Sequence, residues 1–276
     1  MNKRLLLVKD SSEVEELVAK IPQIAGCVVD QSDSNPEAKA LAESASYDVV
    51  LTGVGGTLNE KLSFLEASNG HRRSRVIVLG AEPSPGDVTA AIRRGAFSYF
   101  TAPFQSTCFQ EIVTRALETP DPVAPIQLLS ALPNWIIMQF AAEHVAIERV
   151  LQFLREFHAD LPPALRDNLM MACREVLLNA AEHGCGFDPA KYIQVVYART
   201  KRLLLYQVRD PGPGFAPQSM THAAISNPAG DPIRHLEVRE QQGLRPGGFG
   251  ILVAEKIMDE MLYNEKGNEA LLIKYL

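Results

Sequence analysis

The sequence predicts an α/β protein in which a doubly wound parallel-sheet domain precedes a second, two-layer α/β domain. Three observations support this prediction. Over residues 1–120, five short apolar runs alternate with five amphipathic stretches. A segment with four prolines, 121–133 together with Pro120, then interrupts the pattern. Over 134–276, alternating strand patterns and helical patterns are mixed, which favours a sheet covered by helices.

In the first domain the apolar runs are rich in Val, Ile and Leu, as are strands buried on both faces of a parallel sheet. We expect strands at Arg4–Val8, Ala25–Asp30, Asp48–Thr52, Arg75–Gly80 and Phe97–Thr101. The amphipathic stretches between them predict helices at Ser12–Ile21, Pro36–Ser44, Leu58–Ala67, Gly86–Arg94 and Gln105–Glu118. Segment 121–133 is interpreted as a proline-rich linker, because prolines at that density stop helices.

The second domain opens with an apolar run that predicts a strand at Trp135–Phe140, followed by a helix at Ala142–Phe157. A further helix is expected from Pro163 to about Glu182. Two alternating segments joined by a short polar turn predict adjacent antiparallel strands at Tyr192–Ala198 and Leu203–Arg209. After a Gly/Pro-rich segment, a helix at Phe249–Met261 and a last strand at Glu269–Tyr275 complete the domain.

Composition restricts the function classes. The chain has 276 residues with 27 Lys and Arg against 33 Asp and Glu, a formal charge of −6, which disfavours broad nucleic-acid or anionic-membrane binding. No apolar run reaches the ~20 residues that a membrane-spanning helix needs. The four cysteines lack CxxC spacing, which favours free thiols in a reducing compartment. We therefore expect a cytoplasmic protein.

Three motifs follow one another in the second domain. Glu175 and Asn179 lie four residues apart on one face of a helix. Asp210-Pro-Gly212-Pro-Gly214-Phe215 directly follows a strand, and Gly247-Gly248-Phe249-Gly250 directly precedes a helix. Each alone is weak evidence, since such pairs are common on solvated helices and glycines are common in turns and caps. The order of the three is much more specific.

This order resembles the ATP-binding domain, the Bergerat fold, that is shared by histidine kinases, gyrase, Hsp90 and mismatch-repair ATPases. Within that superfamily, EVLLNAAEHG and GGFGILVAEKIMDEMLY look most like the bacterial anti-sigma-factor serine kinases. The resemblance covers residues 134–276. It implies a two-layer α/β sandwich that uses ATP and Mg²⁺.

The resemblance also implies roles for individual residues. Asn179 would coordinate Mg²⁺ that bridges the ATP phosphates, and Glu175 would act as a general base. Asp210 would accept a hydrogen bond from the adenine amino group. The remaining residues of the implied cofactor site are Gly212, Gly214 and Phe215 near the base, and Gly248 and Gly250 along the triphosphate.

A lid is implied at Ala216–Pro246, in which Arg245, with Arg234 and Arg239, would neutralise phosphate charge. Solvated loop arginines are an equally good interpretation of each. His183 resembles the family's histidine at its position, although a hydrogen-bonded histidine at a helix end is the favoured interpretation. A histidine kinase is disfavoured, because His144 lacks the acidic residue and proline expected after an acceptor, and no room remains for a dimerising hairpin.

Residues 1–120, with GAFSYFTAPF near their end, resemble the flavodoxin-like receiver domain of response regulators. The residues that carry receiver chemistry are missing. Gly53 occupies the position of the aspartate that accepts the phosphoryl group in receivers. Gly80 stands where receivers have a hydroxyl residue after strand four, and Ala102 stands where they have a lysine after strand five. Asp10 is the one obvious acid after strand one. We expect a pseudo-receiver, an interaction or dimerisation module, with Tyr99 as a half-buried strand aromatic.

The leading hypothesis is an ATP-dependent protein serine/threonine kinase of the anti-sigma type. It would phosphorylate a small antagonist protein and control a sigma factor or a similar partner, as a possible homodimer. Two alternatives stay open: a non-catalytic, nucleotide-gated interaction module, and a slow ATPase of the same superfamily. No direct nucleic-acid or membrane partner is expected.

Overall fold

The computed structural model describes residues 3–21, 26–65, 74–132, 134–214 and 249–276. The chain separates into two compact units, and each is described by itself. The first comprises Met1–Pro125 and Glu148–Leu161, and the second comprises Ile126–Ile147 and Pro162–Leu276. The boundaries 1–120, 121–133 and 134–276 stay predictions.

The first unit is built on a five-stranded parallel sheet in the order β2-β1-β3-β4-β5. This is the strand order of flavodoxin-like doubly wound folds, so the predicted fold class is confirmed. The central strands are buried on both faces, which explains their unbroken Val, Ile and Leu content. The strands are β1 (Lys3–Val8), β2 (Cys27–Ser32), β3 (Val49–Leu51), β4 (Arg75–Gly80) and β5 (Ser98–Thr101).

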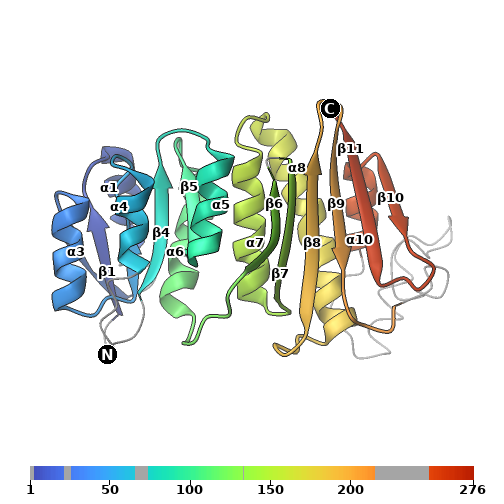
Figure 1. Cartoon of the computed structure of the whole chain (residues 1–276), viewed down its shortest axis with the longest axis horizontal. Coiled ribbons are helices and arrows are strands. Elements are labelled where there is room, and N and C mark those ends of the chain that lie inside the picture. The colour runs from blue at the N-terminus through green and yellow to red at the C-terminus, as the bar shows by residue number, and fades with distance from the viewer. Residues whose placement is uncertain (1–2, 22–25, 66–73, 133, 215–248) are drawn as a thin grey trace. The chain divides into compact units, whose positions relative to one another are not determined.

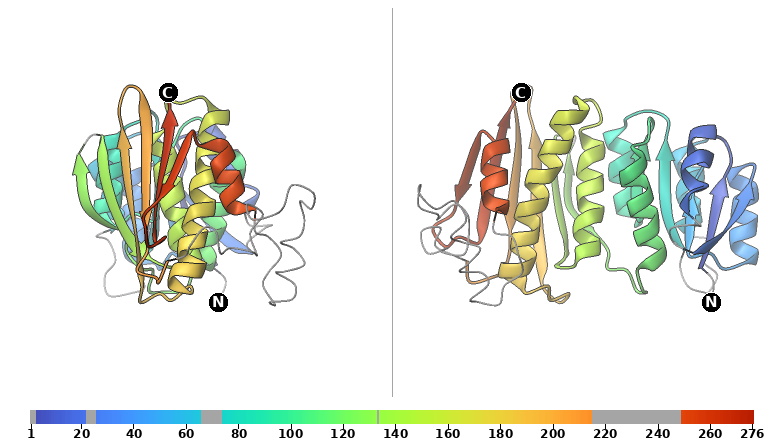
Figure 2. Two further views of the ribbon diagram at one scale, coloured as in Figure 1. Left: turned by 90° about the vertical axis from the view of Figure 1, so that its right-hand side faces the viewer. Right: turned by 180° about the vertical axis from the view of Figure 1, so that it is seen from behind.

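Helices cover both faces of this sheet (Figures 1 and 2): α1 lies beside α6, and α3, α4 and α5 follow one another on the opposite face. Local capping fixes several of their ends. The Ser34 hydroxyl accepts from the Glu37 amide at the start of α3, and Thr57 and Glu60 form a reciprocal capping box at α4. The helices are α1 (Ser12–Val18), α3 (Asn35–Ser44), α4 (Leu58–Leu62), α5 (Pro85–Arg94) and α6 (Ser106–Glu118). The helix predicted at Leu58–Ala67 ends at Leu62 and continues as the 3₁₀ turn Ser63–Leu65.

The second unit is built on a six-stranded antiparallel sheet in the order β10-β11-β9-β8-β7-β6. Helices α8 and α10 lie on one face of it (Figure 2), which makes two layers, as predicted. Buried side chains of β7 and β9, such as Phe140 and Tyr206, form the core together with Leu169 and Leu177 of α8. The strands are β6 (Gln127–Leu132), β7 (Trp135–Ala141), β8 (Tyr192–Arg199), β9 (Leu203–Arg209), β10 (Glu260–Tyr263) and β11 (Glu269–Tyr275).

Two strands of this sheet differ from the sequence predictions. Strand β6 lies in the segment that was interpreted as a linker. Its residues follow the last of three closely spaced prolines, and they form a strand because they pair with β7. The helix predicted at Phe249–Met261 ends at Ile257, and Glu260–Tyr263 forms β10. Pairing of β10 with β11 and the ion pair between Asp259 and Lys274 (2.9 Å) favour a strand over continued helix.

The remaining helices are α7 (His144–Phe157), α8 (Pro163–Asn179) and α10 (Gly250–Ile257). From Glu148 onward, α7 belongs to the first unit. Helix α8 continues into a π-helical turn, Ala180–Cys185, which ends at Gly186 in the left-handed region. π-Turns are rare and occur frequently at functional sites. Among the described residues, no helix has the length and apolar content required to cross a membrane.

Candidate functional site

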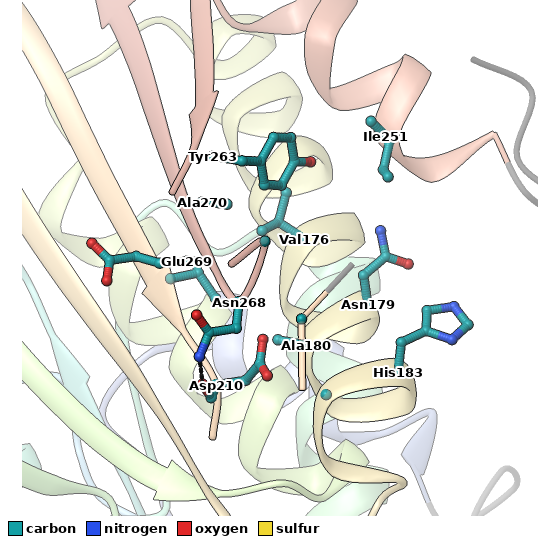
Figure 3. A pocket seen from close by; sticks show the side chains of 14 residues that line it. Val176, Asn179, Ala180, His183, Asp210, Ile251, Tyr263, Asn268, Glu269 and Ala270 are labelled. Carbon is teal, nitrogen blue, oxygen red and sulfur yellow. Dashed lines mark hydrogen bonds between the residues drawn. The ribbon is translucent and has the colours of Figure 1, made fainter. Parts of the chain in front are cut away.

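A cavity of about 150 Å³ lies in the second unit, between the C-terminal end of α8 and the sheet (Figure 3). Its walls come from the π-turn, the end of β9, the start of α10 and the turn between β10 and β11. Most of the lining is apolar, and Asp210 and Asn268 lie at one end of it. The lining residues are Val176, Asn179, Ala180, His183, Gly184, Val208, Asp210, Gly214, Ile251, Tyr263, Gly267, Asn268, Glu269 and Ala270.

Asp210 follows β9 and presents a carboxylate to this cavity. Its Oδ1 accepts a hydrogen bond from the Gly212 amide (2.8 Å). Burial raises the pKa of the Asp210 carboxyl above its ordinary value, while the Gly212 amide and the charge of Lys266 act in the opposite direction. A partly desolvated acceptor at the end of an apolar cavity is suited to a ligand that carries a flat apolar ring with an N–H donor.

Three glycines allow the backbone to close around Asp210. A Cβ on Gly184 would lie 2.8 Å from Asp210 Oδ2 and closer still to its Cγ. A Cβ on Gly212 would lie 2.6 Å from the Cα of Gly184, and one on Gly214 would lie 2.8 Å from the carbonyl carbon of Lys266. Gly214 also has a φ of +79°, which favours glycine. The glycines at 212 and 214 were expected to allow close approach of a nucleotide; they also permit these contacts within the chain.

Asn268 ties the turn before β11 to the end of β9. Its Nδ2 donates to the Asp210 carbonyl oxygen (2.9 Å), and its own main-chain oxygen accepts from the Asp210 amide (3.1 Å). The Asn268 Oδ1 in turn accepts from Nδ2 of Asn264 (3.0 Å). Because both polar ends of its carboxamide are bonded, Asn268 holds the backbone of Asp210 in place.

Glu175 and Asn179 lie on the same side of α8, one turn apart, as their spacing predicts. Asn179 lines the cavity. Glu175 does not line it: its carboxylate lies against the first residue of α10, since a Cβ on Gly250 would be 3.4 Å from Glu175 Cδ and closer to Oε2. A carboxylate at a helix N-terminus is electrostatically favourable. The same helix end is where Gly250 was predicted to approach phosphates.

Several predicted residues lie outside the described part of the chain, namely Phe215, Gly248, Arg245 and the implied lid Ala216–Pro246 with Arg234 and Arg239. Among the described ones, His183 is exposed and lines the cavity from the π-turn (Figure 3). Cys173 and Cys185 are buried free thiols, as expected.

Comparison with known families identifies this part of the chain. Residues 140–274 match the family model of the histidine kinase-like ATPase domain. These residues are a histidine kinase-like ATPase domain. The resemblance read from the three motifs is confirmed at this level, and the narrower likeness to anti-sigma serine kinases stays a proposal.

The cavity of the ATPase domain fits the base of a nucleotide by chemistry and size. About 150 Å³ is too small for a complete nucleotide, since whole small-molecule sites span about 300–1,000 Å³. Its size is compatible with a single flat ring system, and the contact of Asp210 with an adenine amino group stays a prediction. The Asn179 carboxamide oxygen, at the cavity wall, is the type of ligand that Mg²⁺ accepts.

Sequence analysis missed most residues of the ATPase domain's cavity, among them Val176, Gly184, Ile251, Tyr263 and Asn268. Gly184 had a detectable signal, because it is one of two glycines in the HGCG segment directly after the Asn179 motif. Asn268 lies in the NEKGN turn and gave no signal by itself. The apolar residues are typical of any core, so only the three-dimensional arrangement assigns them to the cavity.

Several of the solved structures that resemble the chain are response regulators or receiver domains. An orphan response regulator of H. pylori is 20% identical over 42% of this chain and 97% of its own, with a TM-score of 0.37. The chemotaxis response regulator CheY4 of Vibrio cholerae is 22% identical over 42% of this chain and 100% of its own, with a TM-score of 0.37. The receiver domain of a sensor histidine kinase from Pseudomonas aeruginosa is 23% identical over 43% of this chain and 100% of its own, with a TM-score of 0.35. No curated protein matches the chain.

At the carboxyl edge of the first unit's sheet, the Asp10 side chain fills the space beside Gly53, the position expected for a phosphoryl acceptor. A Cβ on Gly53 would lie 2.9 Å from Cγ of Asp10 and closer to its Oδ2. The two Asp10 oxygens accept from the amides of Val54 (2.8 Å) and Gly55 (2.7 Å). Asp10 therefore fixes the loop after β3 by main-chain hydrogen bonds.

Lys61 and Tyr99 complete this edge. The Lys61 side chain is buried and donates to the carbonyls of Val54 (2.6 Å) and Leu79, and burial lowers the pKa of its ammonium group. Tyr99 was expected to be half-buried, but it is 2% exposed, with its hydroxyl against Gly80. Burial raises the pKa of this hydroxyl. The Ala102–Pro103 peptide is cis.

Proposed function

We propose that the ATPase domain binds ATP with Mg²⁺ and that the chain is a protein serine/threonine kinase of the anti-sigma type. The observation that carries ATP binding is the desolvated Asp210 carboxylate, held by Gly212 and Asn268 at the end of an apolar cavity. Its acceptor oxygens match the exocyclic amino group of adenine, and they would repel the carbonyl oxygen at the same position of guanine.

Glu175 and Asn179 support the catalytic part of the proposal. When bound, ATP supplies the phosphoryl group, and Mg²⁺ offsets the negative charge of its phosphates. Asn179 would offer its carboxamide oxygen to the cation from the cavity wall. Glu175, one turn away beside the start of α10, would accept the proton of a serine or threonine hydroxyl on the protein substrate.

Following the family resemblance, the proposed substrate is a small antagonist protein, and the proposed regulated partner is a sigma factor or a similar protein. The test uses the full chain with radiolabelled ATP, Mg²⁺ and purified candidate antagonists. We expect one antagonist to acquire label on serine or threonine, and Glu175→Gln to abolish labelling while ATP still binds. Glu118→Gln, an exposed carboxylate on α6, is the matched control and should label normally.

One observation favours a second candidate, a nucleotide-gated interaction module without catalysis. Glu175 lies against Gly250 and does not line the cavity, so its carboxylate is not directed at the proposed adenine site. ATP binding without transfer to any antagonist would favour this module. Release of inorganic phosphate that continues without an antagonist would favour the slow ATPase. Labelling that survives Glu175→Gln would refute the proposed base.

A further inference from the structure

A second cavity, of about 450 Å³, lies in the first unit at the amino-terminal edge of its parallel sheet. Arg75 begins β4, and residues 95–97 lead into β5, so the cavity lies at the edge opposite to Asp10 and Gly53. The segment 121–125 and Arg149 complete its wall. Every lining residue belongs to the first unit. Its volume is within the range of small-molecule sites.

Three arginines line this cavity, together with one carboxylate among the described residues: Arg75, Arg94, Arg149 and Asp121. Arg75 and Arg149 are 4% and 3% exposed. Charged side chains are rarely buried to this extent, and guanidinium groups in a concave wall are suited to carboxylates and phosphates because their planar N–H donors bind two oxygens at once.

The two buried arginines are held in place by the protein. Arg75 pairs with Asp121 (2.8 Å) and also donates to the Thr119 carbonyl. Arg149 donates from Nε to the Phe97 carbonyl (2.9 Å) and from Nη1 to the Ala124 carbonyl (2.8 Å). Burial lowers the pKa of the Arg149 guanidinium to about 10, so it stays cationic near neutral pH. Carbonyl dipoles solvate this charge without cancelling it.

The rest of the wall is apolar. Phe64 and Phe97, each at most 3% exposed, contribute to it, together with Leu65, Val123 and two prolines of the segment 121–125. A bare inorganic anion would leave this apolar part of the wall unfilled, and a neutral apolar molecule would make no charge-assisted contact with the arginines. The wall therefore combines two requirements, an anionic group and an apolar body.

We propose that this cavity binds a small organic anion, a carboxylate or a phosphate monoester that carries an apolar or aromatic body. Such a ligand would give the first unit an input that needs no acceptor aspartate. The proposal does not depend on ATP binding or on kinase activity, because it concerns a different cavity that shares no lining residue with the cavity beside Asp210.

The test is a ligand-observed nuclear magnetic resonance titration of the full chain with phenyl phosphate, benzoate and uncharged benzyl alcohol. We expect one or both anions to bind. Benzyl alcohol should bind roughly tenfold more weakly, because it lacks one charge-assisted contact. Binding of phenyl phosphate alone assigns a phosphate site, and binding of benzoate alone assigns a carboxylate site.

Two variants locate the binding. Arg94→Gln, at an exposed cavity residue, should weaken the anion by roughly tenfold. Its control is Arg93→Gln, the exposed neighbour that does not line the cavity, which should leave binding unchanged. Val123→Trp should block the cavity, with folding checked by thermal unfolding. The proposal is overturned if neither anion binds, if benzyl alcohol binds equally well, or if anion binding is the same in Arg94→Gln and Arg93→Gln.

Discussion

Replacing Gly184 by alanine tests the packing around Asp210 most sharply. In a helical turn, alanine is favoured over glycine by up to about 1 kcal/mol, so propensity alone predicts a more stable protein. The structure predicts the opposite effect on the site. The added Cβ would lie 2.8 Å from Asp210 Oδ2 and closer to Cγ, so the carboxylate must rotate or move away.

A displaced carboxylate has two measurable consequences. It loses the hydrogen bond from the Gly212 amide, and it no longer meets the amino group of adenine. Hydrogen bonds to charged groups are worth about 1.5–3 kcal/mol, so ATP affinity should fall by roughly 10–150-fold. Thermal unfolding and isothermal titration calorimetry measure the two effects separately. We expect weak binding by a folded protein.

The matched control is Gly86→Ala, a helical glycine of α5 whose added Cβ would have its nearest neighbour 4.0 Å away. It should raise stability slightly and leave ATP affinity unchanged. If Gly184→Ala binds ATP within about twofold of the wild type, well below the tenfold that 1.4 kcal/mol represents, the assignment of Asp210 to the ligand site is refuted.

Three other predictions concern the pKa of Asp210 and the packing of Asp10 against Gly53. Because burial raises the pKa of Asp210 above 3.8, ATP affinity should decline as pH falls through that raised value. Calorimetry of Asp210→Asn should show no such decline. A decline that persists in the variant contradicts the assignment. The contribution of Asp210 to folding has the opposite pH dependence: it is complete below pH 3.8 and is lost as pH rises through the raised pKa. Asp210→Asn should remove this change from the pH profile of unfolding. Gly53→Asp should not acquire phosphate from acetyl phosphate, because Asp10 occupies the space of the new side chain; stoichiometric labelling would refute this.

The fold was predictable from the sequence where local pattern and tertiary structure agree. Strands such as β4 and β11 are unbroken apolar or alternating runs, and their bounds match the prediction. The misses are places where partners decide. β6 and β10 acquire strand structure by pairing with β7 and β11, and nothing within their own short segments distinguishes them from a linker or a helix end.

The candidate site shows the same division. Asp210 and Asn179 were predictable because their motifs occur in a specific order, and both line the cavity. Asn268 was not, because its role depends on a hydrogen bond to a residue 58 positions away. The same holds for Lys61, whose buried ammonium group binds the Leu79 carbonyl of the neighbouring strand.

The central claim is that the ATPase domain binds ATP through Asp210, and calorimetric titration of the full chain with ATP and Mg²⁺ tests it most directly. We predict one binding site in the wild type, a much weaker response to GTP, and a loss of ATP affinity by roughly 10–150-fold in Asp210→Asn. Asp33→Asn, at an exposed carboxylate of the first unit, should bind like the wild type. No binding of ATP by the wild type, or equal affinity in Asp210→Asn, would contradict the claim.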